Sequence, residues 1–309
     1  MPVSVVLALV GATATGKSAA ALALAQRHDL EVINADAMQL YRGMDIGTAK
    51  TPPAQRAGVP HHLLDILEVT QEAAVADYQV LARRCIAEVI ARGRTPVLVG
   101  GSGLYLRATL DHLEFPATDP AVRARWEERG EREGPGMLHA ELERLDPASA
   151  ERIGSRNTRR LVRALEVIEL TGRPYSATLP TYTYADLGVD AVVQVGLRVP
   201  REQLLERIAS RAEAMFDSGL LAETEHLREL GLERGVTASR AVGYAQALAV
   251  LDGRLTRAEG IEQTSIATRQ VARRQVSWFG RDPRITWLEG TAGLDAQVAG
   301  IERAVGWTS

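Results

Sequence analysis

The residues with the clearest chemical pattern lie close to the start of the 309-residue chain, where Gly11, Gly16, Lys17 and Ser18 complete the pattern G-x-x-x-x-G-K-S/T. In such a loop the backbone N–H groups point inward, the lysine pairs with phosphate oxygens and the serine hydroxyl binds Mg²⁺. The pattern therefore predicts a phosphate-binding loop made of Gly11, Thr13, Ala14, Thr15, Gly16, Lys17 and Ser18, with Ser18 as the metal ligand.

A second polar group lies in the stretch NADAMQLYRGMDIGTAK, which runs from Asn34 to Lys50. Asp36 comes just after an apolar run, at the end of a strand, where open α/β sheets bind their ligands. Its carboxylate could bind a metal ion or act as a general base. The amide of Gln39 could contact the edge of a nucleobase, and Lys50 could reach a phosphate. Together these side chains predict a substrate-binding loop.

The elements that would position these residues follow from the apolar runs. Strands are predicted at Val3–Val10, at Leu30–Asn34, in the run TPVLVGG that precedes Ser102, and at Ala191–Val199. Runs that are apolar on both faces are typical of a parallel sheet. We therefore expect an α/β fold with a P-loop NTPase-like parallel sheet core, formed by residues 1–118 and 190–309. A helical domain is inserted at residues 119–189, and the C-terminal region is helical.

Two stretches are rich in basic residues although the net charge is −3. RIGSRNTRRLVR, in the insertion, holds five arginines and no acidic residue. Nearer the C-terminus, arginines are interleaved with Trp278 and Phe279, two large side chains that also favour burial in a core. Basic side chains pair with phosphates and aromatic rings stack on unpaired bases, so both stretches favour RNA binding.

The composition limits the class of protein. Cys85 is the only cysteine, which excludes an internal disulfide and a cysteine-based zinc site and fits a reducing cytoplasm. The N-terminal apolar run has no basic start, so a strand is expected there and not a signal peptide. No stretch reaches the ~18 apolar residues of a membrane span.

Several of these stretches together resemble a known family. GATATGKS, NADAMQLYRGMDIGTAK, PVLVGGSGLYLRA, RRLVRALEV and TRQVARRQVSWF are similar to successive motifs of bacterial tRNA dimethylallyltransferases, the tRNA isopentenyltransferase family. The resemblance runs from the first strand to about Trp287. Ala37 stands where the family commonly has Ser or Thr, and Ser102 stands where it often has Thr.

The resemblance implies that the phosphate ligand is dimethylallyl diphosphate and not ATP. The prenyl group would move to the exocyclic N6 amine of the adenine 3′-adjacent to the tRNA anticodon. Asp36 would take the amine proton, Ser102 would donate a hydrogen bond near the amine or a phosphate, and Arg211 would stabilise the departing diphosphate.

The resemblance also implies the remaining partners. The acceptor would be the anticodon stem-loop of tRNA. Independently of the resemblance, we expect Mg²⁺ as the cofactor from the loop pattern, a cytoplasmic location from the single cysteine, no membrane contact, and a monomer. The side chains expected to bind tRNA are those of Ala37, Met38, Gln39, Lys50, Arg123, Arg159, Arg160, Arg163, Arg240, Arg273 and Arg274.

Three alternatives remain open at this stage. A P-loop small-molecule kinase would share the fold and use Asp36 as a base for a hydroxyl, but it would not need the arginine-rich stretches. A prenyltransferase could instead act on free adenine nucleotides. A non-catalytic RNA-binding protein would bind tRNA without releasing diphosphate.

Overall fold

The computed structural model describes residues 4–113, 115–116, 118–178 and 182–307. A six-stranded parallel sheet forms its centre, with the strand order β3-β2-β4-β1-β5-β6. The strands are β1 (Val5–Val10), β2 (Leu30–Asn34), β3 (His61–His62), β4 (Thr95–Val99), β5 (Ala191–Arg198) and β6 (Ile285–Glu289). The four predicted strands all occur, and the predicted residue Val3 lies outside the described residues.

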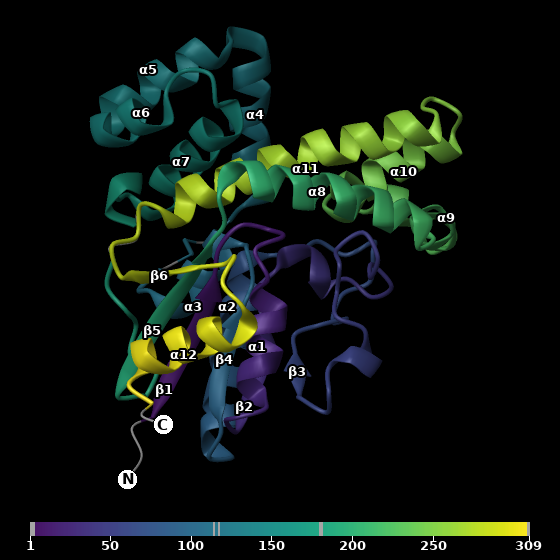
Figure 1. The fold of residues 1–309 in the computed structure, drawn as a ribbon. Coiled ribbons are helices and arrows are strands. Elements are labelled where there is room, and N and C mark those ends of the chain that lie inside the picture. Colours follow the sequence, from purple (N-terminus) through teal and green to yellow (C-terminus); the bar gives the residue numbers. More distant parts are fainter. Residues whose placement is uncertain (1–3, 114, 117, 179–181, 308–309) are drawn as a thin grey trace. The chain divides into compact units, whose positions relative to one another are not determined.

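Helices cover both faces of the sheet (Figure 1). Helices α1 (Lys17–Ala25) and α12 (Leu294–Val305) pack on one face, and α2 (Val75–Ala91) and α3 (Gly103–Leu110) pack on the other. Alternate residues of β1 point to the two faces, so Leu7 and Leu9 join the first core while Val6 and Ala8 join the second. This double burial explains why β1 is apolar throughout.

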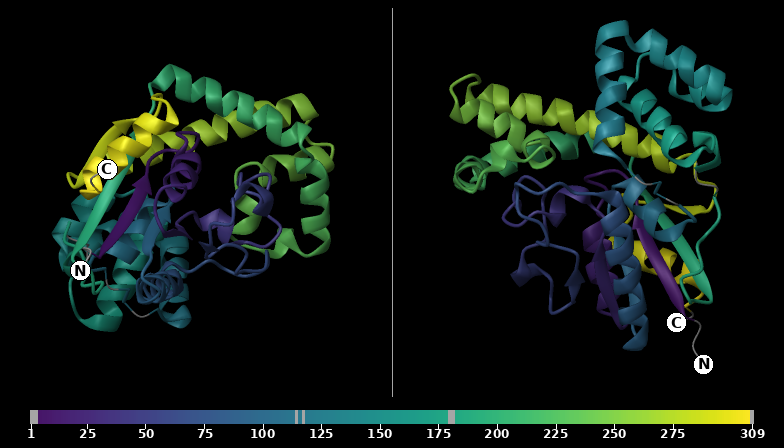
Figure 2. Two further views of the ribbon diagram at one scale, coloured as in Figure 1. Left: turned by 60° about the horizontal axis from the view of Figure 1, so that its bottom comes forward. Right: turned by 180° about the vertical axis from the view of Figure 1, so that it is seen from behind.

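Four helices lie beyond the carboxyl ends of the strands, with α8 and α11 side by side (Figure 2). They are α8 (Arg201–Asp217), α9 (Leu220–Glu229), α10 (Tyr244–Leu251) and α11 (Arg257–Phe279), with short 3₁₀ turns at Leu232–Arg234 and Ala238–Arg240. A separate apolar cluster that includes Tyr41, Phe216, Leu220 and Tyr244 joins α8, α9 and α10 to the segment after β2. The long α11 starts with a capping box between Thr256 and Glu259, which satisfies two otherwise unpaired N–H groups.

Residues Asp111–Thr183 form a second compact unit, and Met1–Leu110 together with Tyr184–Ser309 form the first. The second unit contains α4 (Pro120–Glu133), α5 (Pro135–Leu145), α6 (Pro147–Ile153), α7 (Thr158–Thr171) and a 3₁₀ turn at Tyr175–Thr178. Its own core is built around Leu138, Leu142, Leu161 and Leu165. The helical insertion is thus present, and both of its boundaries lie earlier in the chain than the predicted 119–189.

The prediction of a P-loop-like parallel sheet with a helical insertion is confirmed, with two differences in detail. Among the described residues, the helical C-terminal region also contains β6, an edge strand that pairs with β5. His61 and His62 form the two-residue strand β3, which pairs with β2.

Phe279 is buried, whereas Trp278 keeps 38% of its surface exposed. Within the described residues, no helix has the length and apolar character needed to cross a membrane.

Candidate functional site

The phosphate-binding loop connects β1 to α1 and depends on two glycines. Gly11 has φ +136° and Gly16 has φ +94°, values that side-chain-bearing residues rarely adopt. A Cβ on Gly11 would also lie 2.8 Å from the carbonyl oxygen of Leu197 on the neighbouring strand β5. Gly11 therefore lets the loop turn directly against the sheet, at the carboxyl end of its central strand.

The first turn of α1 faces this loop. Gly16 precedes the helix, and no side chain caps its N-terminus, so N–H groups of the first turn remain available for an anion. Lys17 Nζ donates to the carbonyl oxygens of Gly11 and Ala12 at 3.0 and 2.6 Å. An ammonium group has three N–H donors, so Lys17 keeps one for a ligand.

Burial lowers the pKa of Lys17 to about 8, because an ammonium group loses hydration inside the protein. The Asp36 carboxylate opposes this shift, and the Arg211 guanidinium adds to it. An anion at the loop would favour the charged form of Lys17. The low pKa of Lys17 is thus mainly a consequence of its burial, and the positive charge of Arg211 contributes less.

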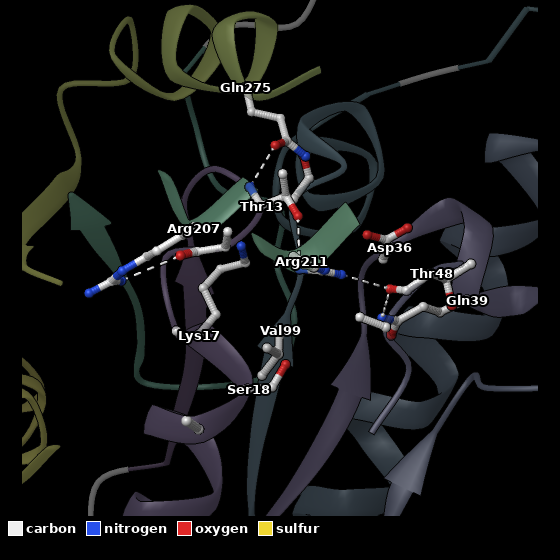
Figure 3. A pocket seen from close by; sticks show the side chains of 16 residues that line it. Thr13, Lys17, Ser18, Asp36, Gln39, Thr48, Val99, Arg207, Arg211 and Gln275 are labelled. Atoms are coloured by element: carbon white, nitrogen blue, oxygen red, sulfur yellow. Dashed lines mark hydrogen bonds between the residues drawn. The ribbon is translucent and has the colours of Figure 1, made fainter. Parts of the chain in front are cut away.

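A cavity of about 360 Å³ opens beside the loop (Figure 3). Its lining brings together Thr13, Ala14, Gly16, Lys17, Ser18, Asp36, Gln39, Thr48, Gly101, Arg207, Arg211 and Gln275. Three of these side chains are cationic and one is a carboxylate. The candidate diphosphate residues and the candidate base therefore share one cavity, although Asp36 lies on a different strand end from the loop.

Asp36 follows β2 and is held by its neighbours. Its N–H donates to Asn34 Oδ1 at 2.9 Å, and its own Oδ1 accepts the N–H of Met38 at 3.0 Å. The second interaction caps the 3₁₀ turn Ala37–Leu40. One oxygen of the carboxylate is therefore used to fix its direction, and the other accepts no hydrogen bond from the residues that the structure describes.

Ser102 lies in the loop between β4 and α3. Its N–H donates to the carbonyl oxygen of Ala35, and its hydroxyl oxygen accepts the N–H of Ala37 at 3.0 Å. A Cβ on Gly100 would lie 2.1 Å from the same carbonyl oxygen of Ala35, so only glycine allows this approach. Ser102 thus holds the backbone next to Asp36 and keeps its hydroxyl hydrogen for a substrate.

Arg211 reaches the cavity from α8. One guanidinium nitrogen donates to Thr13 Oγ1 at 3.2 Å and the other to the carbonyl oxygen of Thr48 at 3.3 Å. Burial lowers the pKa of Arg211, and the Asp36 carboxylate opposes that shift. Arg207, one turn earlier, is exposed and reaches the Ala14 carbonyl oxygen at 3.4 Å.

The segment after Asp36 supports Arg211 from the other side. Gln39 Nε2 donates to the Thr48 carbonyl oxygen at 3.1 Å. Lys50 is buried, and its ammonium group contacts Asp45 and Asp65 at 2.6 Å each. The side chain of Lys50 is therefore engaged within the protein, and a contact with RNA stays a prediction. Ala37 and Met38 lie in the 3₁₀ turn, half-buried.

The candidate tRNA residues of the second unit fall into two groups. Arg123 and Arg163 both pair with Glu166, which has no exposed surface. Burial alone would raise the pKa of Glu166, but hydrogen bonds from Arg163 and the Asp119 N–H lower it overall. Arg159 and Arg160 are instead exposed in the first turn of α7.

The remaining candidates lie on the first unit. Arg240 ends a 3₁₀ turn, and Arg273 and Arg274 lie on α11; all three are exposed. Glu223 and Gln275 were not predicted from the sequence. Glu223 accepts the N–H of Ile46 at 2.9 Å and the hydroxyl of Tyr244 at 2.6 Å, which anchors the loop that leads to Thr48.

The described residues contain no group of three or more His, Cys, Asp or Glu side chains that could hold a metal ion. Ser18 is exposed at the cavity, and Asp36 lines the same cavity. Magnesium usually binds one or two protein oxygens together with substrate phosphates and water. The oxygen donors present would suit an ion carried with a diphosphate.

Comparison with known proteins shows the family of the chain. The IPP transferase family model matches residues 39–282. The tRNA dimethylallyltransferase of Pseudarthrobacter chlorophenolicus is 57% identical over 297 residues, covering 96% of this chain and 97% of that protein. The crystal structure of a tRNA isopentenylpyrophosphate transferase from Bacillus halodurans has a TM-score of 0.71 at 37% identity, covering 98% of this chain and 95% of that one.

A eukaryotic dimethylallyltransferase captured in crystals acting on tRNA is also similar. Its TM-score is 0.79 at 25% identity, over 98% of this chain and 77% of that chain. Because the family model spans most of this chain, and a relative more than half identical to it matches nearly its whole length, the chain belongs to the IPP transferase family.

Proposed function

We propose that this chain transfers a dimethylallyl group from dimethylallyl diphosphate to the exocyclic N6 amine of the adenine 3′-adjacent to the tRNA anticodon, releasing diphosphate. The names of its relatives support this activity. The observation that carries the proposal is that one cavity contains both the phosphate-binding loop with Arg211 and the carboxylate of Asp36. A leaving-group site and a proton acceptor are what this reaction needs.

The donor would bind with its diphosphate against the N–H groups of the loop, Lys17 and Arg211. During transfer the bond between the allylic carbon and the diphosphate oxygen breaks, and its electron pair leaves with the diphosphate. Donors already aimed at that oxygen stabilise the developing charge without reorganisation. The half-buried position of Lys17 strengthens this effect, because the local dielectric is below that of water.

The acceptor nitrogen is a weak nucleophile because its lone pair is delocalised into the adenine ring. As the new carbon–nitrogen bond forms, positive charge develops on nitrogen, and the free oxygen of Asp36 takes the proton. General-base assistance of this kind contributes roughly 10²–10⁴-fold in rate. Ser102 would donate its hydroxyl hydrogen near the amine or a phosphate, while its oxygen holds the N–H of Ala37.

We further propose that Mg²⁺ accompanies the donor, with the Ser18 hydroxyl as a protein ligand. The ion would neutralise part of the charge on the diphosphate. The chain's own residues would orient the diphosphate through the N–H groups of the loop and the remaining N–H of Lys17.

The adenine must leave the stack of the anticodon loop before its amine can reach the cavity, and such extrusion is cheapest in a single-stranded loop. The exposed arginines would pair with the surrounding phosphates. They are Arg159 and Arg160 on α7, Arg240 in a 3₁₀ turn, and Arg273 and Arg274 on α11. Arg123 and Arg163 would act mainly by holding Glu166.

We also propose that the protein acts as a cytoplasmic monomer.

An isotope experiment tests this function. The protein is incubated with unmodified tRNA and either prenyl-labelled dimethylallyl diphosphate or γ-labelled ATP. Label entering tRNA from the prenyl donor supports the proposal, whereas phosphoryl transfer without prenyl transfer would establish a kinase. Free AMP that outcompetes tRNA would point to the nucleotide prenyltransferase. The kinase alternative finds no support among the relatives.

A further inference from the structure

The side chain of Gln275 on α11 joins two loops of the candidate site. Its Oε1 accepts the backbone N–H of Thr13 in the phosphate-binding loop at 2.8 Å. Its Nε2 donates to the carbonyl oxygen of Gly101, in the loop that carries Ser102, at 3.0 Å. Figure 3 shows the amide above the loop, pointing into the cavity.

The contact with the Ser102 loop is close-packed. A Cβ on Gly101 would lie 2.3 Å from Gln275 Nε2, and a Cβ on Gly103 would lie 2.2 Å from the ring of Trp278. Trp278 follows Gln275 by about one helical turn, so both contacts come from one face of α11. The two glycines let α11 approach the loop, and Gln275 then supplies the hydrogen bond that fixes its position.

Thr13 is held from two directions. Gln275 accepts its N–H, and Arg211 on α8 donates to its hydroxyl oxygen. Because α8 and α11 pack side by side, the phosphate-binding loop is tied to this helix pair as well as to the sheet. The distance between the loop and Ser102 is therefore set by an amide whose two ends contact both.

We propose that Gln275 is a positioning residue that fixes the phosphate-binding loop relative to the Ser102 loop, so that the donor diphosphate lies correctly for attack on its allylic carbon. This inference rests on the proposed function. The site requires a side chain that accepts at one end and donates at the other, as the carboxamide of glutamine does. Methionine offers neither group, and an ionised glutamate cannot donate.

The first test compares Gln275→Met with the control Gln263→Met. Gln263 lies exposed on the same helix, and its side chain makes no hydrogen bond to the described residues. We expect Gln275→Met to lower kcat/KM for dimethylallyl diphosphate about tenfold, equivalent to about 1.4 kcal/mol for two lost hydrogen bonds. Its KM for tRNA should remain within about twofold of the wild type, because the tRNA contacts are made by other side chains.

The second test uses Gln275→Glu, with Gln263→Glu as its control. A protonated glutamate can accept from Thr13 and donate to Gly101, as glutamine does. An ionised one places a negative charge beside a carbonyl oxygen and near the diphosphate. The pKa of an unperturbed glutamate is about 4.3, so the carboxyl is ionised at pH 8 and becomes protonated as the pH is lowered toward that value. The ratio of the variant's kcat/KM to that of the wild type should therefore be about tenfold below one at pH 8 and rise toward one as the pH falls through the pKa of the carboxyl. A loss of stability alone would not produce this pH-dependent rescue.

Binding of inorganic diphosphate, measured by calorimetry across the same pH range, separates the inference from the proposed function. If the wild type binds diphosphate but transfers no prenyl group, the proposed function fails and the affinities of the variants still test Gln275. If Gln275→Met matches the wild type in donor KM, kcat and diphosphate affinity, the inference is wrong. A Gln275→Glu profile parallel to the wild type would also overturn it.

Discussion

The guanidinium group of Arg211 lies 3.2 Å from the hydroxyl oxygen of Thr13, which joins helix α8 to the phosphate-binding loop. The same guanidinium reaches the carbonyl oxygen of Thr48 on the other side of the cavity. Both of these partners are protein atoms, so Arg211 is held in place before a ligand arrives. Its remaining N–H donors can then act on a diphosphate without a change of side-chain conformation.

Replacing Arg211 with Lys should therefore impair donor use although the charge is retained. A lysine ammonium cannot contact Thr13 and Thr48 with the planar fork of a guanidinium. We expect kcat/KM for dimethylallyl diphosphate to fall about tenfold to hundredfold. Arg201→Lys, exposed in the first turn of the same helix, provides the matched control. Equal kinetics for the two variants would show that Arg211 does not stabilise the diphosphate.

Asp36→Asn removes the proton acceptor and leaves the local structure in place, because the asparagine oxygen can still accept the Met38 N–H. Prenyl transfer in a single turnover should slow by roughly 10²–10⁴, while tRNA affinity stays unchanged. Asp29→Asn, exposed before β2, is the control. A single-turnover rate close to that of the wild type would exclude Asp36 as the base.

The pH dependence of donor binding should reflect Lys17, whose pKa is lowered to about 8 in the free protein. Below that pH the ammonium is charged and attracts the diphosphate. Above it, Lys17 is mostly neutral and must take up a proton before it can attract the diphosphate. The affinity should therefore fall by up to about tenfold per pH unit. Calorimetry from pH 7 to 10 measures this slope.

Lys17→Arg provides the comparison for that titration, since a guanidinium stays protonated over the whole range. The change of its donor affinity with pH reports any titration of the donor itself. The difference between the slopes of the wild type and the variant is then due to the titration of Lys17. If the wild type and the variant have the same slope, the charge of Lys17 does not contribute to binding.

Replacing Arg159 and Arg160 together with Ala should weaken tRNA binding and flatten its dependence on salt. Each lost phosphate contact lowers the log–log slope by about 0.7 on a single strand and about 0.9 on a duplex. A double Arg132→Ala and Arg144→Ala variant removes the same charge elsewhere in the second unit, where both arginines pair with glutamates. Matching slopes for the two double variants would place Arg159 and Arg160 away from the RNA.

The fold followed from sequence where the signal was local. β1, β2, β4 and β5 are apolar runs, and the loop after β1 has a fixed spacing of glycines, lysine and serine. Strand β6 was missed because five residues at the edge of a sheet carry little pattern of their own, and two of them are exposed. The short strand β3 forms only because β2 lies beside it.

The site followed from sequence only in part, for a similar reason. Asp36 and Arg211 could be named from their motifs, but Gln275 is brought to Thr13 across 262 residues. The arginines and aromatic side chains of its stretch indicate RNA binding, and nothing in the pattern distinguishes the glutamine. Lys50 and Arg163 show the converse, because in the sequence their charges appear available for RNA. The sequence gives no sign that Lys50 contacts two aspartates or that Arg163 contacts a buried glutamate.

The most direct test of the account is a crystal structure with a thio analogue of dimethylallyl diphosphate, whose carbon–sulfur bond resists cleavage. We predict that its diphosphate will bind the loop N–H groups, Lys17 and Arg211, with the allylic carbon on the side of Asp36. A nucleoside triphosphate that fills the same loop in preference to this analogue, with its terminal phosphoryl group facing a hydroxyl substrate, would contradict the account.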